Sequence, residues 1–174
     1  TGLIPPGRAR ELGHFNHLLH GMISDITGQG LSLDIYANQN SHDMKWERQQ
    51  EYLELAARNV RFNLYPGRPI HKIAATINQY DWGFFYDNIQ DSSYDTSHYQ
   101  YNMATKFFSY LEGGVPIIIY RQAGYIASLV EKYGLGVVYD ASHPSSLRSI
   151  IDKADYASLS ANVARIREQW ELSH

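Results

Sequence analysis

The sequence predicts an α/β fold, namely a Rossmann-like open parallel sheet of about six strands with helices on both faces. Segments with helical spacing of apolar residues alternate six times with short apolar runs that are typical of strands. The connections are mostly short, which is typical of crossovers between parallel strands. The run from Ile117 to Ile119 is apolar throughout, as expected for a strand buried on both sides.

In the first half of the chain, the spacing of apolar residues separates helices from strands. Phe15, Met22 and Ile26 share one face of a helix, whereas Leu33 and Ile35 alternate as in a strand with one buried face. The predicted elements are, in order, a strand ending at Leu3–Ile4, a helix over 14–26, a strand over 31–37, a more polar helix over 44–58 and a strand over 60–64.

The second half continues the alternation. Pro69 opens a helix, Gly113 and Gly114 end another, and Gly134 ends a third. The predicted elements are, in order, a helix with Ile70, Ile73, Ala74 and Ile77 on its apolar face, a strand over 82–86, a polar loop over 87–101, a helix from about 102, a strand over 117–119, a helix striped by Ile126, Leu129, Val130 and Tyr133, a strand over 137–139, and helices over 147–154 and 156–174.

Length, charge and residue usage exclude several classes of protein. At 174 residues, with 44% hydrophobic content, the chain can fill the core of one domain and is rather short for two. The net charge is −3 and the basic residues are scattered, so we expect no nucleic-acid partner. The absence of cysteine excludes disulfides and Cys-ligated zinc. No apolar run approaches the roughly 20 residues of a membrane helix, so we expect no transmembrane segment in this chain.

The helix that begins near Met103 is the first candidate for a binding site. The start of a helix that faces the carboxyl ends of strands carries N–H groups and the positive end of the helix dipole. Lys106 adds a full positive charge within the first turn. This combination is suited to holding a phosphate.

Lys106, Tyr110, Gly114 and Pro116 stand in the spacing K-x-x-x-Y-x-x-x-G-x-P-I-I. This pattern resembles the donor-site helix and following strand in the C-terminal half of GT-B glycosyltransferases, closest to the glycosyltransferase family 4-like, or group 1, type. The resemblance covers residues 2–152. It implies one half of a GT-B fold, in which residues 1–154 bind a nucleoside diphosphate sugar. Residues 155–174 are then a C-terminal helix that packs toward an N-terminal domain of the same polypeptide.

The resemblance also implies roles for individual residues. For the phosphates it indicates Arg8, Met103, Ala104, Thr105 and Lys106; for the base and ribose Tyr65, Pro66, Gly67 and Ser109; and for the sugar Tyr99 and Tyr101. Tyr101 and Ser109 stand where many retaining relatives carry two glutamates, and Leu3 stands where they carry an arginine. Tyr110 is expected in the core with its hydroxyl group hydrogen-bonded.

The function implied is metal-independent transfer of a sugar from a nucleoside diphosphate sugar, with a UDP-sugar favoured and no cofactor. We expect a cytoplasmic protein of polysaccharide biosynthesis, cut from a longer polypeptide that supplies the acceptor site and any membrane association. Alone, this chain is expected to bind the donor without turnover. A non-catalytic nucleotide-binding or scaffolding module, and one half of a nucleotide-sugar epimerase, remain alternatives.

Other sites of α/β proteins fit less well. A dinucleotide site needs G-x-G-x-x-G after the first strand, but Pro5–Arg10 stands there, and a P-loop is absent. Asp87, Asp91, Asp95 and His98 would share a helix face, but they lie in a segment without helical periodicity, so we assign no metal site. No chemistry is assigned to His14, His17 and His20.

Overall fold

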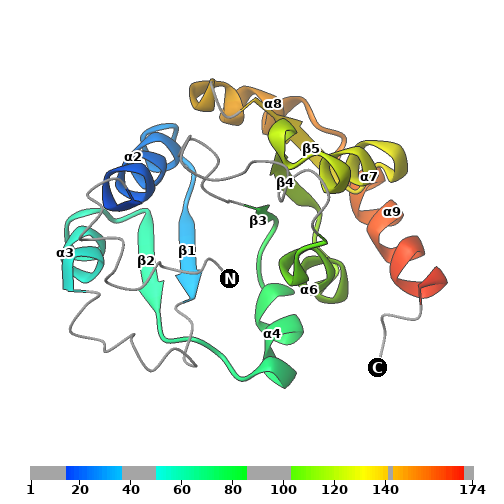
Figure 1. The fold of residues 1–174 in the computed structure, drawn as a ribbon, viewed down its shortest axis with the longest axis horizontal. Coiled ribbons are helices and arrows are strands. Elements are labelled where there is room, and N and C mark those ends of the chain that lie inside the picture. The colour runs from blue at the N-terminus through cyan, green and yellow to red at the C-terminus, as the bar shows by residue number, and fades with distance from the viewer. Residues whose placement is uncertain (1–14, 37–49, 86–102, 141–142, 171–174) are drawn as a thin grey trace. The chain divides into compact units, whose positions relative to one another are not determined.

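The protein is described here by a computed structural model that covers residues 15–36, 50–85, 103–140 and 143–170 (Figure 1). The chain divides into two compact units, with the boundary between Arg68 and Pro69. Each unit contains its own parallel sheet.

In unit 1, which ends at Arg68, the described residues form a two-stranded parallel sheet and two helices. Its elements are α2 (Phe15–Gly28), β1 (Leu33–Tyr36), α3 (Gln50–Arg58) and β2 (Phe62–Tyr65). Leu33 lies opposite Phe62, and Tyr36 lies opposite Tyr65, so both strands end at the same edge. The buried apolar side chains of this unit are Ile23, Ile26, Leu33, Ile35, Tyr52, Phe62 and Leu64.

A buried hydroxyl group joins α2 to the turn before β2. The Thr27 hydroxyl donates a 2.8 Å hydrogen bond to the carbonyl oxygen of Ile23 and accepts a 2.9 Å bond from Asn59 Nδ2. Because both bonds are internal, Thr27 can be buried without an unsatisfied polar group.

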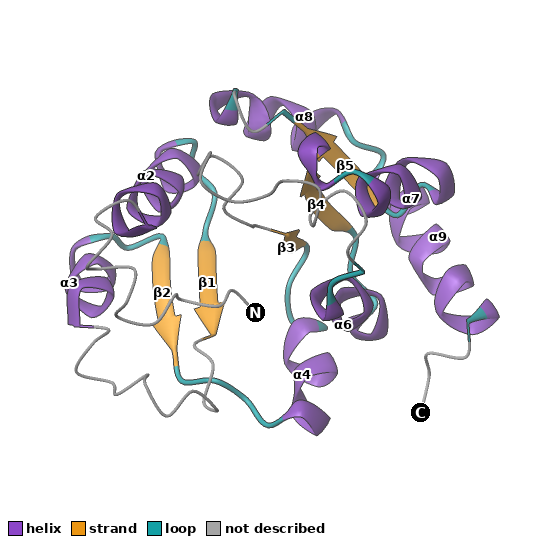
Figure 2. Cartoon of the chain, viewed as in Figure 1, coloured by secondary structure: helices purple, strands orange, loops and turns teal. Residues whose placement is uncertain are grey.

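In unit 2, which begins at Pro69, the described strands form a three-stranded parallel sheet in the order β3-β4-β5 (Figure 2). Its elements are α4 (Ile70–Ile77), β3 (Gly83–Phe85), α6 (Thr105–Gly113), β4 (Ile117–Tyr120), the 3₁₀ turn η2 (Arg121–Ala123), α7 (Tyr125–Tyr133), β5 (Gly136–Tyr139), the 3₁₀ turn η3 (Pro144–Ser146), α8 (Leu147–Lys153) and α9 (Tyr156–Gln169). All four residues of the central strand, β4, are buried, as the apolar run predicts.

Helix α9 belongs to the core of unit 2. Its Val163 and Ile166 are completely buried. Beyond its end, the Trp170 ring lies 6.4 Å from the Phe107 ring of α6 and 5.9 Å from the Tyr133 ring of α7, measured between centroids. Val163, Ile166 and Trp170 therefore pack within unit 2.

The prediction of one six-stranded sheet is corrected. The described residues form five strands in two sheets, all paired in parallel. Apolar spacing predicts that a segment is a strand, but the hydrogen bonds between strands decide which sheet it joins. The predicted strand at Leu3–Ile4 and the predicted loop over 87–101 lie outside the described residues.

Two boundary differences have local causes. Ile70 was expected on the buried face of α4, but it is 88% exposed. It is the first residue of the helix, and Ile77, just under two turns later, is the residue that is buried. Val60 was expected to begin a strand, but it lies in a turn, and β2 begins at Phe62.

None of the helices in the described part of the chain could cross a bilayer. The longest, α2 and α9, have 14 residues each, whereas a spanning helix needs about 20.

Candidate functional site

The start of α6 lacks a side-chain cap. Ala104, at the N-cap, has an extended backbone and a methyl side chain that cannot accept a hydrogen bond. The first turn holds no acidic residue to balance the helix dipole. Helix α9 differs, because Asp155 at its N-cap accepts a 3.1 Å hydrogen bond from the Ser158 amide. The start of α6 is therefore suited to an anion from outside the helix.

Lys106 lies at the carboxyl end of β3. Its Nζ atom is 5.4 Å from the centre of the ring of Phe85, the last residue of that strand. Lys106 is half-buried, whereas Met103 and Thr105 are exposed and Ala104 is half-buried. The four consecutive residues predicted to hold phosphate thus lie together at an accessible helix start, at the sheet edge where α/β proteins bind ligands.

Ser109 and Tyr110 follow on the same helix. The Ser109 hydroxyl donates a 3.2 Å hydrogen bond to the Thr105 carbonyl oxygen, one turn earlier. The Tyr110 hydroxyl donates a 2.7 Å bond to the Phe84 carbonyl oxygen, and burial raises its pKa above the ordinary tyrosine value. Tyr110 is thus a core residue with its hydroxyl bonded, as expected, whereas the Ser109 oxygen can still accept a bond.

The carboxyl edge of unit 1 carries an aromatic pair. The Tyr36 and Tyr65 rings, at the ends of β1 and β2, are stacked with centroids 5.1 Å apart and planes at 26°. The Arg68 guanidinium carbon lies 5.8 Å from the centre of the Tyr36 ring. Of the other residues predicted at this turn, Pro66 is exposed and Gly67 is buried.

The pKa of the Tyr65 hydroxyl group is raised. The Asp34 carboxylate raises the pKa of Tyr65, and burial and Tyr36 add smaller contributions in the same direction. Asp34 itself accepts a 2.8 Å hydrogen bond from Asn63 Nδ2 across the two strands. Sequence reasoning missed Tyr36 and Arg68, although parallel pairing of the two predicted strands would have placed Tyr36 beside Tyr65.

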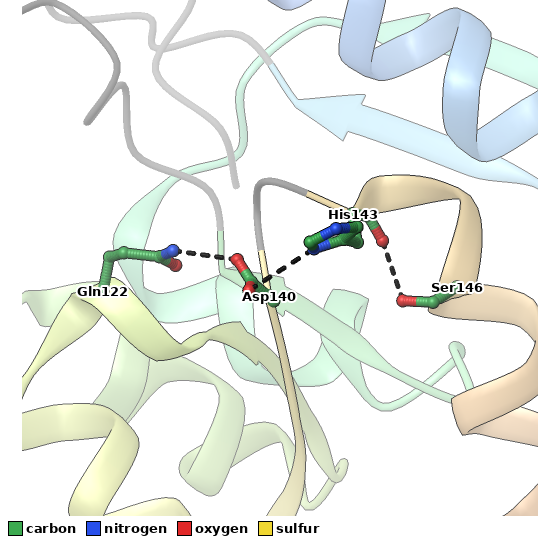
Figure 3. Close-up of polar contacts among 4 residues, drawn as sticks. All are labelled: Gln122, Asp140, His143 and Ser146. Atoms are coloured by element: carbon green, nitrogen blue, oxygen red, sulfur yellow. Dashed lines mark hydrogen bonds and ion pairs between the residues drawn. The ribbon is translucent and has the colours of Figure 1, made fainter.

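A second polar group was not predicted. Gln122, just beyond β4, and Asp140 and His143, beyond β5, lie together at the carboxyl edge of the sheet in unit 2 (Figure 3). We call these three residues the Gln-Asp-His group. No motif marks it in the sequence, since its members come from two separate strand ends.

Several predicted residues are outside the described part. Arg8, Tyr99 and Tyr101 belong there, as do the acidic residues and His98 of the segment 87–98. Within the described ranges, no three or more His, Asp or Glu side chains gather in a way that could hold a metal ion.

The chain matches a known family. The model of the family described as "Glucosyltransferase 3-like, C-terminal domain" matches residues 23–171. No curated protein matches the chain.

Proposed function

The chain belongs to the glucosyltransferase 3-like C-terminal domain family, and from this premise we propose that it is the donor-binding half of a glycosyltransferase of the GT-B, family 4-like type. Its substrate is a nucleoside diphosphate sugar, with a UDP-sugar favoured. The observation that carries the proposal is the uncapped start of α6 with Lys106 beside it, at the carboxyl end of β3. An anionic diphosphate fits this place because both features attract negative charge.

The same features can assist the reaction. When the bond between the sugar and the diphosphate breaks, its electron pair stays on the phosphate oxygen, and negative charge grows there. The Lys106 ammonium group and the N–H groups at the start of α6 stabilise that charge more strongly in the transition state than in the bound donor. Arg8 adds a second cation in this proposal, and neither a metal ion nor a cofactor is required.

Other parts of the donor have proposed contacts of their own. Tyr65, Pro66 and Gly67 receive the base, with the ring of Tyr65 as a stacking surface supported by its pair with Tyr36. Ser109 accepts a hydrogen bond from a ribose hydroxyl, and Tyr99 and Tyr101 contact the sugar. These assignments are independent of one another and can be tested one residue at a time.

The acceptor and any general base come, in this proposal, from an N-terminal domain of the same polypeptide. In this proposal the protein is cytoplasmic and acts in polysaccharide biosynthesis. Alone, residues 1–174 then bind the donor but do not turn it over.

Calorimetric titration of the chain with UDP, GDP and ADP at low ionic strength tests the proposal. We expect one of the three to bind, and Lys106→Ala to weaken its binding by about tenfold or more, since charged hydrogen bonds contribute about 1.5–3 kcal/mol. Lys132→Ala is the matched control, because the Lys132 ammonium also lies over an aromatic ring, that of Tyr133, at 5.1 Å. Its effect should be negligible.

The opposite results identify the alternatives. Absence of heat with all three nucleotides would favour the non-catalytic scaffolding module. If Lys106→Ala and Lys132→Ala weaken nucleotide binding equally, the assignment of Lys106 to the phosphates is wrong. An assay of the full-length polypeptide for sugar transfer, as against inversion of a sugar carbon, separates a transferase from half of an epimerase.

A further inference from the structure

The Gln-Asp-His group lies on the same edge of unit 2 as the start of α6. Gln122 is in η2, directly after β4, and Asp140 directly follows β5. Lys106 lies over Phe85 at the end of β3, the third strand of this sheet. Because the three strands are parallel, their carboxyl ends share one edge, and groups that follow them face a common ligand position.

Hydrogen bonds from separate elements fix the group. Gln122 Nε2 donates a 3.0 Å bond to Asp140 Oδ1, and His143 Nδ1 lies 3.5 Å from Asp140 Oδ2. The main chain holds His143 in turn, because its amide donates to the Asp140 carbonyl oxygen at 2.9 Å. The Ser146 hydroxyl and amide donate to the His143 carbonyl oxygen at 2.7 and 3.1 Å. Figure 3 shows the three side chains directed toward one another.

The side chains remain accessible to a ligand. The side chain of Asp140 is 45% exposed and that of His143 is 75% exposed. Each carboxylate oxygen can accept more than one hydrogen bond, the Gln122 amide offers a carbonyl oxygen, and the imidazole Nε2 can donate or accept. Donors and acceptors set side by side match the hydroxyl groups of a sugar, each of which donates one bond and accepts others.

Charge indicates which part of a nucleotide sugar fits here. The Asp140 carboxylate repels phosphate, whereas it accepts bonds readily from neutral hydroxyl groups. Lys106 and the start of α6 attract phosphate instead. The edge therefore has a cationic end for a diphosphate and an anionic, hydroxyl-binding end.

The spacing between these ends suits one donor molecule. Strands β3 and β5 are two positions apart, which is about 10 Å at the usual strand separation. The last residues of the three strands are aromatic: the Phe85 and Tyr120 rings are 6.0 Å apart, and Tyr120 lies opposite Tyr139. A hexose attached to a diphosphate at Lys106 would extend over a distance of this order.

We propose that Gln122, Asp140 and His143 bind the hydroxyl groups of the donor sugar. This inference rests on the proposed function, since it assumes that the diphosphate is held at α6. It adds a specificity-determining site for the sugar, separate from the residues that bind the nucleotide.

The test compares a nucleoside diphosphate with its glucose conjugate. Calorimetry with UDP and UDP-glucose, and with the GDP and ADP pairs, is carried out on the unaltered chain, Asp140→Asn and His143→Ala. We expect each substitution to weaken binding of the glucose conjugate by about tenfold, the loss of one or two good hydrogen bonds, and to leave binding of the free diphosphate unchanged. Asp152→Asn is the matched control, an exposed carboxylate on α8 that pairs with Arg148 at 2.8 Å.

Each other outcome overturns a defined statement. If both variants bind the conjugate as well as the unaltered chain does, and Lys106→Ala still weakens nucleotide binding, this inference is overturned and the proposed function is not. If the substitutions weaken binding of the free diphosphate and of the conjugate equally, the Gln-Asp-His group stabilises the fold or binds the nucleotide. This result also overturns the inference. Failure of the unaltered chain to bind any nucleotide overturns the proposed function, and this inference with it.

Discussion

The Tyr110 hydroxyl donates a 2.7 Å hydrogen bond to the main-chain carbonyl oxygen of Phe84, and this bond joins the middle of α6 to β3. One helical turn earlier, Lys106 lies over Phe85, the next residue of the same strand. A turn of helix rises about 5.4 Å and one strand residue about 3.3 Å, so both contacts fit a helix that runs back along the strand. Tyr110 thereby holds the start of α6 at the sheet edge.

Tyr110→Phe should therefore destabilise unit 2 without changing the shape of its core. The substitution removes the donor and leaves the Phe84 carbonyl oxygen without this bond, which costs about 1–2 kcal/mol. Urea unfolding at pH 7 measures the loss. A change below the error of the midpoint would show that water replaces the hydroxyl group.

The same residue should make stability sensitive to alkaline pH. Burial raises the pKa of Tyr110 in the folded chain above its ordinary value of 10.0. The contribution of the neutral side chain is thus complete below pH 10 and is lost as pH rises toward the folded-state pKa, because only the unfolded chain ionises readily. Stability measured between pH 8 and about 11 should fall more steeply in the unaltered chain than in Tyr110→Phe. Parallel curves would contradict this assignment.

The Tyr110 ring packs directly against Gly83. A β-carbon there would overlap the Tyr110 ring, which is buried and cannot move away. Gly83→Ala should cost about 2–3 kcal/mol through overpacking. Gly21→Ala is the contrasting control, because a β-carbon at this exposed helical glycine would meet no described atom within 4 Å apart from those of its own helix. It should stabilise the chain by about 0.5–1 kcal/mol, and equal effects at both positions would refute the steric explanation.

Local features of the fold were readable from the sequence because they depend on neighbouring residues. Gly114 and Gly134 were predicted to end helices, and both adopt positive φ angles, 73° and 60°, at the C-caps of α6 and α7. The buried strand over Ile117–Ile119 was confirmed with one further residue. The sheets were not readable, since strand pairing joins segments that are far apart in sequence.

Only part of the candidate site could likewise be predicted from the sequence. Lys106 could be found because the start of a helix and a basic residue are adjacent in the sequence. Asp140 and Gln122 could not, because 17 residues separate them in the chain and only the pairing of β4 with β5 brings them together. Tyr36 is intermediate, since both strands were predicted to within two residues of their bounds and only their register was missing.

The cap of α9 should make the chain sensitive to acid. The side-chain and main-chain hydrogen bonds from Ser158 lower the pKa of Asp155 below 3.8. A carboxylate with a lowered folded-state pKa contributes stability above its unfolded pKa, and that contribution is lost as pH falls through the folded value. Asp155→Ala should lower the thermal midpoint at pH 7 by roughly 2–4 °C, the effect of losing a typical N-cap.

Asp155→Asn separates the cap from its charge. Asparagine can accept the same bond from the Ser158 amide, so its midpoint at pH 7 should stay near that of the unaltered chain. Between pH 5 and about 2 its midpoint should fall less steeply than that of the unaltered chain, because the side chain no longer takes up a proton. If the midpoints of the two chains fall equally steeply with pH, other carboxylates cause the loss of stability in acid.

The stacked tyrosines of unit 1 give the last prediction. If Tyr65 receives the nucleotide base, Tyr65→Ala should weaken binding of the preferred nucleotide by about tenfold, since one base stacked on an aromatic ring contributes about 1–3 kcal/mol. Tyr65→Phe should bind almost as well as the unaltered chain, because it keeps the ring that stacks on Tyr36. Tyr125→Ala, at a half-exposed tyrosine that begins α7, controls for loss of an aromatic side chain in general. Calorimetry on the three variants decides the matter: equal binding by Tyr65→Ala and Tyr65→Phe would mean that the base is held by main-chain groups at Pro66 and Gly67 instead.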